Sequence, residues 1–171
     1  YSNCTLELRT KSNQIKPLDK IEPIKNCVIA FSLMPDKISL ALDKKAPTIK
    51  RRIATIKKLS ALGWKIGLRF DPLIFGDSWK DQYQDLHENI FNVINISSIH
   101  SISYGPLRFP IAMYKKINSM YQNEKLFVGP FEQNQSEVSY KQEIEDEMTE
   151  FCKNLSLNFA PESLIFNCKS N

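Results

Sequence analysis

Two opposite charges end an otherwise apolar run in the segment Lys65–Trp79, "KIGLRFDPLIFGDSW". Arg69 and Asp71 stand two residues apart in this run, and Pro72 follows directly. Arginine binds carboxylates and phosphates through paired hydrogen bonds, and a carboxylate can hold an ammonium group or ribose hydroxyls. Buried charges are stable only when they are paired, solvated or bound to a ligand. The segment therefore predicts a site of both signs, which suits a zwitterion better than a simple anion.

The charges of this segment share one face of a predicted strand, because side chains alternate between the two faces of a strand. One face carries Ile66, Leu68 and Phe70, and the other carries Gly67, Arg69 and Asp71. We expect the apolar face to pack under helices. The charged face should then look into a barrel or onto a cleft.

Polar side chains stand near the ends of other apolar runs as well. Lys11 follows "LELRT", Ser32 lies in "IAFSL", Ser103 lies in "IHSISY", and Arg108 lies in the turn "GPLRFP". In α/β proteins the carboxyl ends of the strands form the edge where ligands bind. These residues therefore predict a binding site at that edge. The alternative that stays open is a set of ordinary salt bridges and helix caps.

The elements that would hold these residues alternate between strand-like and helix-like patterns. Strands are expected at Cys4–Thr10, Cys27–Leu33, Ile66–Phe70, Ile99–Ser103 and Leu164–Asn167, with a short one considered at Leu126–Val128. Helices are expected at Pro47–Leu62, after a Ser78–Asp81 capping box, from Pro110, and at Tyr140–Leu155, and most of Asn123–Ser139 is expected to be loop. Lys50, Arg51, Lys57 and Lys58 are predicted to form a solvated helix face. This alternation indicates parallel strands with crossover helices, in an open doubly wound sheet or a barrel.

Composition excludes several classes of protein. The 171 residues suffice for one domain, and 42% apolar residues, 25% charged residues and a net charge of +4 are ordinary for a globular protein. No apolar run approaches the ~18 residues of a membrane span. No phosphate-binding loop, dinucleotide fingerprint or nucleophile elbow is present. The four cysteines lack metal-ligand spacing and are expected to be reduced; they are Cys4, Cys27, Cys152 and Cys168.

Several short motifs in a fixed order resemble the spore photoproduct lyase family of radical S-adenosylmethionine proteins. They are "LELRTKS", "FSLMPDKI", "RRIATIKKLSALGWKIGLRFDPLI", "ISYGPLRFP" and a late helix before "LIFNC". The resemblance implies an α/β fold, a partial (β/α) barrel with parallel strands and outer helices. It also implies S-adenosylmethionine and a [4Fe–4S] cluster as cofactors, and a 5′-deoxyadenosyl radical that reverses a thymine photoproduct in DNA. The sequence "RFDP" is more similar to a broader lyase-like branch, whose substrates need not be the spore lesion.

The resemblance begins after the cluster-binding CxxxCxxC motif, which these residues lack. It implies that residues 1–171 form a single domain, the C-terminal portion of a larger barrel, with the cluster ligands outside this chain and no metal site within it. By position, Lys11 and Ser32 match residues that contact S-adenosylmethionine. Asp71 is assigned to the same cofactor, Arg69 is added from the inward-face argument, and Ser103 and Arg108 are assigned to the substrate.

Two functional hypotheses follow. In the first, the chain is part of a cytoplasmic radical lyase-like enzyme and is inactive without the missing cluster-binding segment. Its expected partners are damaged DNA and that N-terminal segment, and no membrane contact is expected. The second is a non-catalytic α/β module that binds a small anionic or zwitterionic ligand at its strand ends. A third interpretation, which describes the isolated 171 residues best, is a structural fragment whose activity depends wholly on a missing N-terminal segment.

Overall fold

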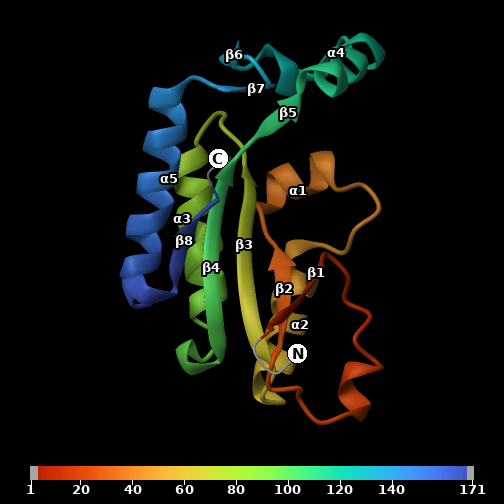
Figure 1. The fold of residues 1–171 in the computed structure, drawn as a ribbon, viewed down its shortest axis with the longest axis vertical. Coiled ribbons are helices and arrows are strands. Elements are labelled where there is room, and N and C mark those ends of the chain that lie inside the picture. The colour runs from red at the N-terminus through yellow and green to blue at the C-terminus, as the bar shows by residue number, and fades with distance from the viewer. Residues whose placement is uncertain (1–3, 169–171) are drawn as a thin grey trace.

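The computed structural model describes residues 4–168, which are built around a five-stranded sheet (Figure 1). All neighbouring strands are parallel, and their order is β1-β2-β3-β4-β8. The strands are β1 (Leu6–Thr10), β2 (Cys27–Ser32), β3 (Lys65–Leu73), β4 (Ile99–Pro106) and β8 (Ile165–Asn167). The predicted α/β class with parallel strands is confirmed. Since β1 and β8 are both edge strands, the sheet does not close on itself within residues 4–168.

Helices cover one face of this sheet. Figure 1 shows α2 (Ile49–Ala61), α3 (Trp79–Phe91) and α5 (Gln142–Leu157) on the same side of the strands. The short α1 (Asp36–Leu42) and α4 (Ile111–Met120) lie instead toward the carboxyl ends of the strands. Short 3-10 turns also occur in the described residues, at Leu18–Lys20, Ile96–Ser98, Lys125–Val128 and Glu162–Leu164.

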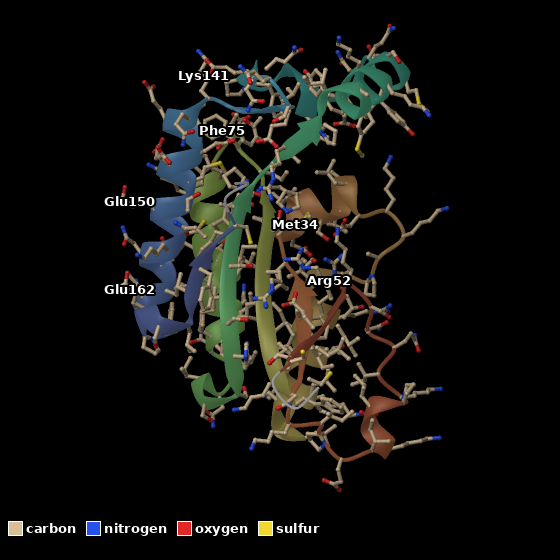
Figure 2. All side chains as sticks on the ribbon, in the orientation of Figure 1. Met34, Arg52, Phe75, Lys141, Glu150 and Glu162 are labelled. Atoms are coloured by element: carbon tan, nitrogen blue, oxygen red, sulfur yellow. The ribbon has the colours of Figure 1, made fainter. Side chains whose placement is uncertain are left out.

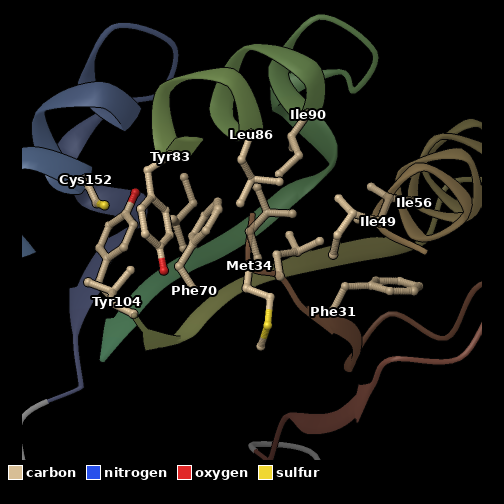
Figure 3. Close-up of a cluster of buried hydrophobic side chains, with 14 of the residues drawn as sticks. Phe31, Met34, Ile49, Ile56, Phe70, Tyr83, Leu86, Ile90, Tyr104 and Cys152 are labelled. Carbon is tan, nitrogen blue, oxygen red and sulfur yellow. The ribbon is translucent and has the colours of Figure 1, made fainter. Parts of the chain in front are cut away.

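The core fills the space between the helices and the sheet, as the alternation in β3 predicts. Ile66, Leu68 and Phe70 are fully buried within it. The ring of Phe70 stacks on His87 of α3 with centroids 4.5 Å apart, and on Tyr104 of β4 at 5.3 Å. Figure 3 shows Phe70 and Tyr104 among side chains from α3 and α5. The opposite face of the strands is therefore left for polar residues.

The helix expected at Pro47–Leu62 is observed as α2, with both predicted ends close to their places. The Thr48 hydroxyl accepts a hydrogen bond from the backbone of Arg51, and this caps the first turn. Gly63 follows the helix with a φ of 92°, a conformation that glycine adopts without strain. The basic residues at positions 50, 51, 57 and 58 are exposed, as predicted.

A small antiparallel sheet follows β4, where most of the chain was expected to be loop. Its strands are β5 (Arg108–Pro110), β7 (Glu137–Tyr140) and β6 (Phe131–Gln133), in that order. The strand considered at Leu126–Val128 is instead part of a 3-10 turn, and Tyr140 belongs to β7 rather than to α5. Three-residue strands carry too little alternation to be recognised from a sequence, so the prediction was wrong here.

The end of β3 also differs from its prediction. The strand runs through Pro72 to Leu73, with a register shift against β4 after Phe70. Ser78 precedes α3 but makes no side-chain cap, so the capping box is absent. The backbone after the strand is held by two tyrosine hydroxyls instead, since Tyr83 accepts a hydrogen bond from Ile74 and Tyr140 accepts one from Phe75.

His87 is a buried titratable group in this core. Its Nδ1 lies 2.6 Å from the Tyr83 carbonyl oxygen, and its Nε2 lies 3.4 Å from the Tyr104 hydroxyl. That hydroxyl is in turn hydrogen-bonded to Ser156 of α5. Burial lowers the pKa of His87 to about 4, although the hydrogen bond to Tyr83 opposes the shift.

Acid should therefore weaken the fold through His87. The unfolded imidazole takes up a proton near pH 6.5 and the folded one only near pH 4, so stability is full above pH 6.5. Between these two values the free energy of unfolding should fall by roughly 3 kcal/mol. Urea unfolding across this range measures the fall. His87→Phe, which keeps the stacking on Phe70, should flatten it, and His100→Phe at an exposed position should not; equal slopes in all three proteins would refute the assignment.

Candidate site on the inner face of the sheet

The polar residues predicted for the site lie on the face of the sheet opposite α2 and α3. Ser32, Arg69 and Ser103 are neighbours in register across β2, β3 and β4. One layer nearer the amino ends, Gly67 is flanked by Ala30 and Ser101. The strands thus bring the polar residues of three separate segments into two adjacent rows.

Arg69 is buried, and its side chain points toward the row that contains Gly67 and Ser101. Its guanidinium donates to both carboxylate oxygens of Glu7 on β1, with Nη2–Oε2 at 2.6 Å and Nε–Oε1 at 3.2 Å. It also donates to the Ser101 carbonyl oxygen at 3.1 Å and to the Ser101 hydroxyl at 2.7 Å. Arg69 is therefore paired, which was one of the outcomes that the sequence allowed.

The absence of a side chain at Gly67 makes room for this guanidinium. A Cβ added there would lie 2.8 Å from Nη2 of Arg69 and 2.9 Å from the Cβ of Ala30. Both distances are shorter than real Cβ atoms show. The position of the Arg69 side chain in the folded protein therefore requires glycine at position 67.

Substituting Gly67 by alanine should cost about 1–3 kcal/mol of unfolding free energy, because the new methyl group overpacks the inner face. Urea unfolding would measure this loss. The matched control is Gly76→Ala, since a Cβ at Gly76 would meet no atom within 4 Å. If the two substitutions changed stability equally, the close approach at Gly67 would have no energetic consequence.

Charges of alternating sign continue from Arg69 across the inner face. Glu7 also lies 3.6 Å from the Arg9 guanidinium, and Arg9 lies 3.6 Å from Asp71 Oδ2. The hydrogen bond from Arg69 lowers the pKa of the Glu7 carboxyl, with the charge of Arg9 adding to the effect. The result is a spatial series of paired charges in the order Arg69, Glu7, Arg9 and Asp71. Asp71 lies nearest the carboxyl edge of the sheet.

Asp71 shares that edge with Arg108. A Cβ built on Gly105 would lie 3.0 Å from Asp71 Oδ1 and 3.3 Å from Arg108 Nη1, so both side chains lie against this glycine. Arg108 Nη1 also donates to the Pro106 carbonyl oxygen at 3.3 Å. The structure thus brings together the two residues that the sequence assigned separately to cofactor and substrate.

Lys11 is fixed by a residue that the sequence reasoning missed. Its Nζ lies 2.5 Å from Oδ1 of Asp43, in the loop between α1 and α2. Oδ2 of the same carboxylate accepts a hydrogen bond from Arg52 at 2.8 Å. Arg52 stands in the apolar stripe of α2, three residues after Ile49 and four before Ile56, and this spacing was a readable signal of its burial.

Ser103 is the buried hydroxyl of the site that lacks a partner. Its side chain is 95% shielded, and no described residue offers its Oγ a hydrogen bond. A buried hydroxyl without a partner carries a desolvation cost that a ligand or a water molecule can relieve. Together with Ser32 in the same row, it presents hydroxyls on both sides of Arg69.

Two hollows open at the carboxyl edge, and each is lined by one of the predicted residues, whereas Ser32, Arg69, Asp71 and Ser103 line neither. A cavity of about 420 Å³ is lined by Lys11, by the charged residues Asp43, Lys44 and Glu124, and by mostly apolar residues that include Leu107, Phe109 and Phe127. A second one of about 170 Å³ is polar and is lined by Arg108, Glu137, Glu145 and Asn167 among others. Burial raises the pKa of Glu145 in this smaller cavity. Lys11 and Arg108 therefore belong to different hollows along one edge.

Residues 4–168 contain no group of three His, Cys, Asp or Glu side chains that could hold a metal ion. The cysteines are free thiols: Cys27 and Cys152 are buried, Cys168 is partly exposed and Cys4 is exposed. A [4Fe–4S] cluster therefore does not fit the described part of this chain. None of the helices in this range combines the length and hydrophobicity that a membrane span requires.

The family model described as spore photoproduct lyase matches residues 2–163. No curated protein gives a significant match. Solved structures do match, and each is a form of spore photoproduct lyase.

One of these is a variant with bound AdoMet and dinucleoside spore photoproduct. It superposes with a TM-score of 0.80 at 15% identity, over 98% of this chain and 51% of that one. A second variant gives 0.81 at 16% identity, over 95% and 50%. A complex with the dinucleoside spore photoproduct gives 0.78 at 15% identity, with the same coverage as the second.

At such identities the superpositions establish a shared fold, and they show that the chain spans about half the length of these structures. The matched fold is the α/β architecture with parallel strands and outer helices that the motifs implied. The family itself rests on the sequence match, which extends over nearly all of the chain. The chain belongs to the spore photoproduct lyase family.

Proposed function

We propose that residues 1–171 are the C-terminal portion of a radical S-adenosylmethionine lyase-like protein. The family match supports this, as does the coverage of only about half of the related structures. The β1 edge adds support, because Leu6 and Leu8 are 57% and 43% exposed on a strand that pairs with β2 on one side and with no described strand on the other. An exposed apolar edge strand is a surface on which further strands can pair. On this proposal the [4Fe–4S] cluster is held by a segment outside the chain.

The carboxyl edge of the sheet would hold S-adenosylmethionine. The observation that carries the proposal is the placement of Lys11, the Ser32 strand end and Asp71 along this edge, with Lys11 linked through Asp43 and Arg52 to the Ser32 carbonyl oxygen. Lys11 suits the carboxylate of the methionine moiety, and Asp71 suits its ammonium group or the ribose hydroxyls. The cavity of about 420 Å³ is of the size that small-molecule sites have. Arg69 was also predicted to bind the cofactor. Because its guanidinium is already paired with Glu7, it would contribute positive charge to the inner face of the sheet next to the cofactor.

The reduced cluster, held by the other segment, would give S-adenosylmethionine the one electron needed to yield methionine and a 5′-deoxyadenosyl radical. The residues of this chain would bind and orient that cofactor, and they would not themselves carry out the electron transfer. Without the cluster-binding segment the isolated chain would be inactive.

Damaged DNA is the proposed substrate. A solved structure of spore photoproduct lyase that matches this chain is a complex with a dinucleoside spore photoproduct, which supports this proposal. The guanidinium of Arg108 is suited to bind a phosphate or the carbonyl oxygen of a base. The hydroxyl of Ser103, which has no partner among the described residues, is suited to form a hydrogen bond with the edge of a base. The lesion of this protein need not be the same as that of its relatives.

Anaerobic reconstitution of the complete gene product with iron and sulfide tests the proposal. After reduction and addition of S-adenosylmethionine, we expect an iron–sulfur absorption band and the release of 5′-deoxyadenosine. A protein that forms no cluster and releases no 5′-deoxyadenosine would refute it. The alternating charges from Arg69 to Asp71 favour one other function, the binding of a small zwitterion without metal. That function predicts metal-independent binding of such a ligand by the apoprotein.

A further inference from the structure

An arginine with no exposed side-chain surface lies where α2 meets the end of β2. Arg52 donates from Nε to the Pro47 carbonyl oxygen at 3.0 Å and from Nη1 to the Ser32 carbonyl oxygen at 3.0 Å. Its Nη2 lies 2.8 Å from Asp43 Oδ2 and 3.5 Å from the Ser39 hydroxyl. Figure 2 shows Arg52 between β2 and α1. The side chain therefore ties together α1, α2, the loop between them and the end of β2.

Asp43 connects this arginine to the carboxyl edge. Its two carboxylate oxygens accept from different cations, Oδ2 from Arg52 and Oδ1 from Lys11. Burial by itself raises the pKa of Asp43, but the hydrogen bonds from Lys11 and Arg52 outweigh burial and lower it. The carboxylate is thus held ionised between a buried cation and a partly exposed one.

Two of the groups fixed by this network are residues assigned to the cofactor. Arg52 holds the backbone of Ser32 through its carbonyl oxygen, and Asp43 holds the ammonium group of Lys11. An ammonium group has three N–H donors, and the described residues use one of them. Lys11 also lines the cavity of about 420 Å³. The remaining donors are therefore available to a ligand there, at an orientation that Asp43 sets.

We propose that Asp43 and Arg52 are positioning residues, which hold Lys11 and the Ser32 strand end in place for S-adenosylmethionine. This inference rests on the proposed function and extends it to two residues that do not themselves touch the cofactor. A buried ion pair does not by itself imply a gain in stability, since apolar residues of similar volume often replace one without loss. The positioning role follows instead from where the four contacts of Arg52 and the second oxygen of Asp43 lead. A side chain placed in this way sets the geometry of a binding group before the ligand arrives.

The test measures S-adenosylmethionine binding by calorimetry in the complete gene product, without any requirement for turnover. Asp43→Asn keeps the shape of the side chain and removes its charge, so Lys11 should lose its fixed orientation. We expect binding to weaken by about tenfold or more, as for other lost charged hydrogen bonds. The matched control is Asp19→Asn, which removes the exposed ion pair with Lys58 and should leave affinity unchanged.

A double-variant cycle separates positioning from a general loss of structure. If Asp43 acts through Lys11, then Lys11→Met combined with Asp43→Asn should bind no more weakly than Lys11→Met alone. Fully additive losses would overturn the inference. Asp43→Glu, which retains the charge and so protects the fold, provides a second test: it should still weaken binding, because the longer side chain shifts Lys11.

The outcomes distinguish this inference from the function on which it rests. If the unsubstituted protein bound S-adenosylmethionine and both Asp43 variants bound it equally well, the positioning role would be overturned while the proposed function stood. If the unsubstituted protein bound none, the proposed function would fail and the inference with it. Thermal unfolding of every variant confirms that each comparison is between folded proteins.

Discussion

Phe70→Ala is expected to destabilise the protein by about 3–5 kcal/mol, which is the usual range for removing a buried aromatic ring. Phe70 has no exposed surface, and it stacks on both His87 and Tyr104. Its removal would leave a cavity between β3 and α3 that surrounding side chains can fill only in part. Chemical unfolding monitored by circular dichroism would give the loss directly.

The matched control for this prediction is Phe166→Ala. Phe166 lies on β8 with 55% of its side chain exposed, so its truncation should change stability by less than about 1 kcal/mol. Comparable losses at the two positions would mean that the helix-covered face of β3 is not the main core of this fold.

Arg69→Met is expected to cost about 3–4 kcal/mol, near the lower end of the range for breaking a buried ion pair. The substitution would remove the Arg69 donors from the Ser101 hydroxyl and from the Glu7 carboxylate, which would keep only the longer contacts with His100 and Arg9. The loss falls short of the full range because Glu7 is 39% exposed and water can replace part of the interaction. Urea unfolding at neutral pH would measure it.

An exposed ion pair is the appropriate comparison for Arg69. Lys80 pairs with Glu147 between α3 and α5, and both side chains are about half exposed. Lys80→Met should therefore change stability by less than about 1 kcal/mol. If Arg69→Met were equally mild, the charges on the inner face would be solvated rather than structurally required.

The face assignment of β3 could be made from the sequence, because strand alternation depends only on the identity of successive residues. Ile66 and Phe70 face the helices, and Arg69 and Asp71 face the opposite side. The requirement that both charges be paired also followed from elementary electrostatics. Their partners, Glu7 and Arg9 on β1, could not be derived, since strand order is not visible in a single sequence.

The network around Asp43 shows a second limit. Asp43 stands in a loop with no periodic pattern, and only the fold brings it to Lys11. Arg52 did carry a signal, because an arginine occupied a position in an apolar helical stripe. The antiparallel sheet after β4 was missed because its short strands are defined by pairing with one another rather than by any local pattern.

The central claim is that the carboxyl edge of this sheet binds S-adenosylmethionine, and a crystal structure of the complete gene product with that cofactor tests it most directly. The account predicts the methionine carboxylate within hydrogen-bonding distance of Lys11 Nζ, with Ser32 and Asp71 in contact with the ligand. A ligand bound at the amino ends of the strands, or on the face covered by α2 and α3, would contradict it.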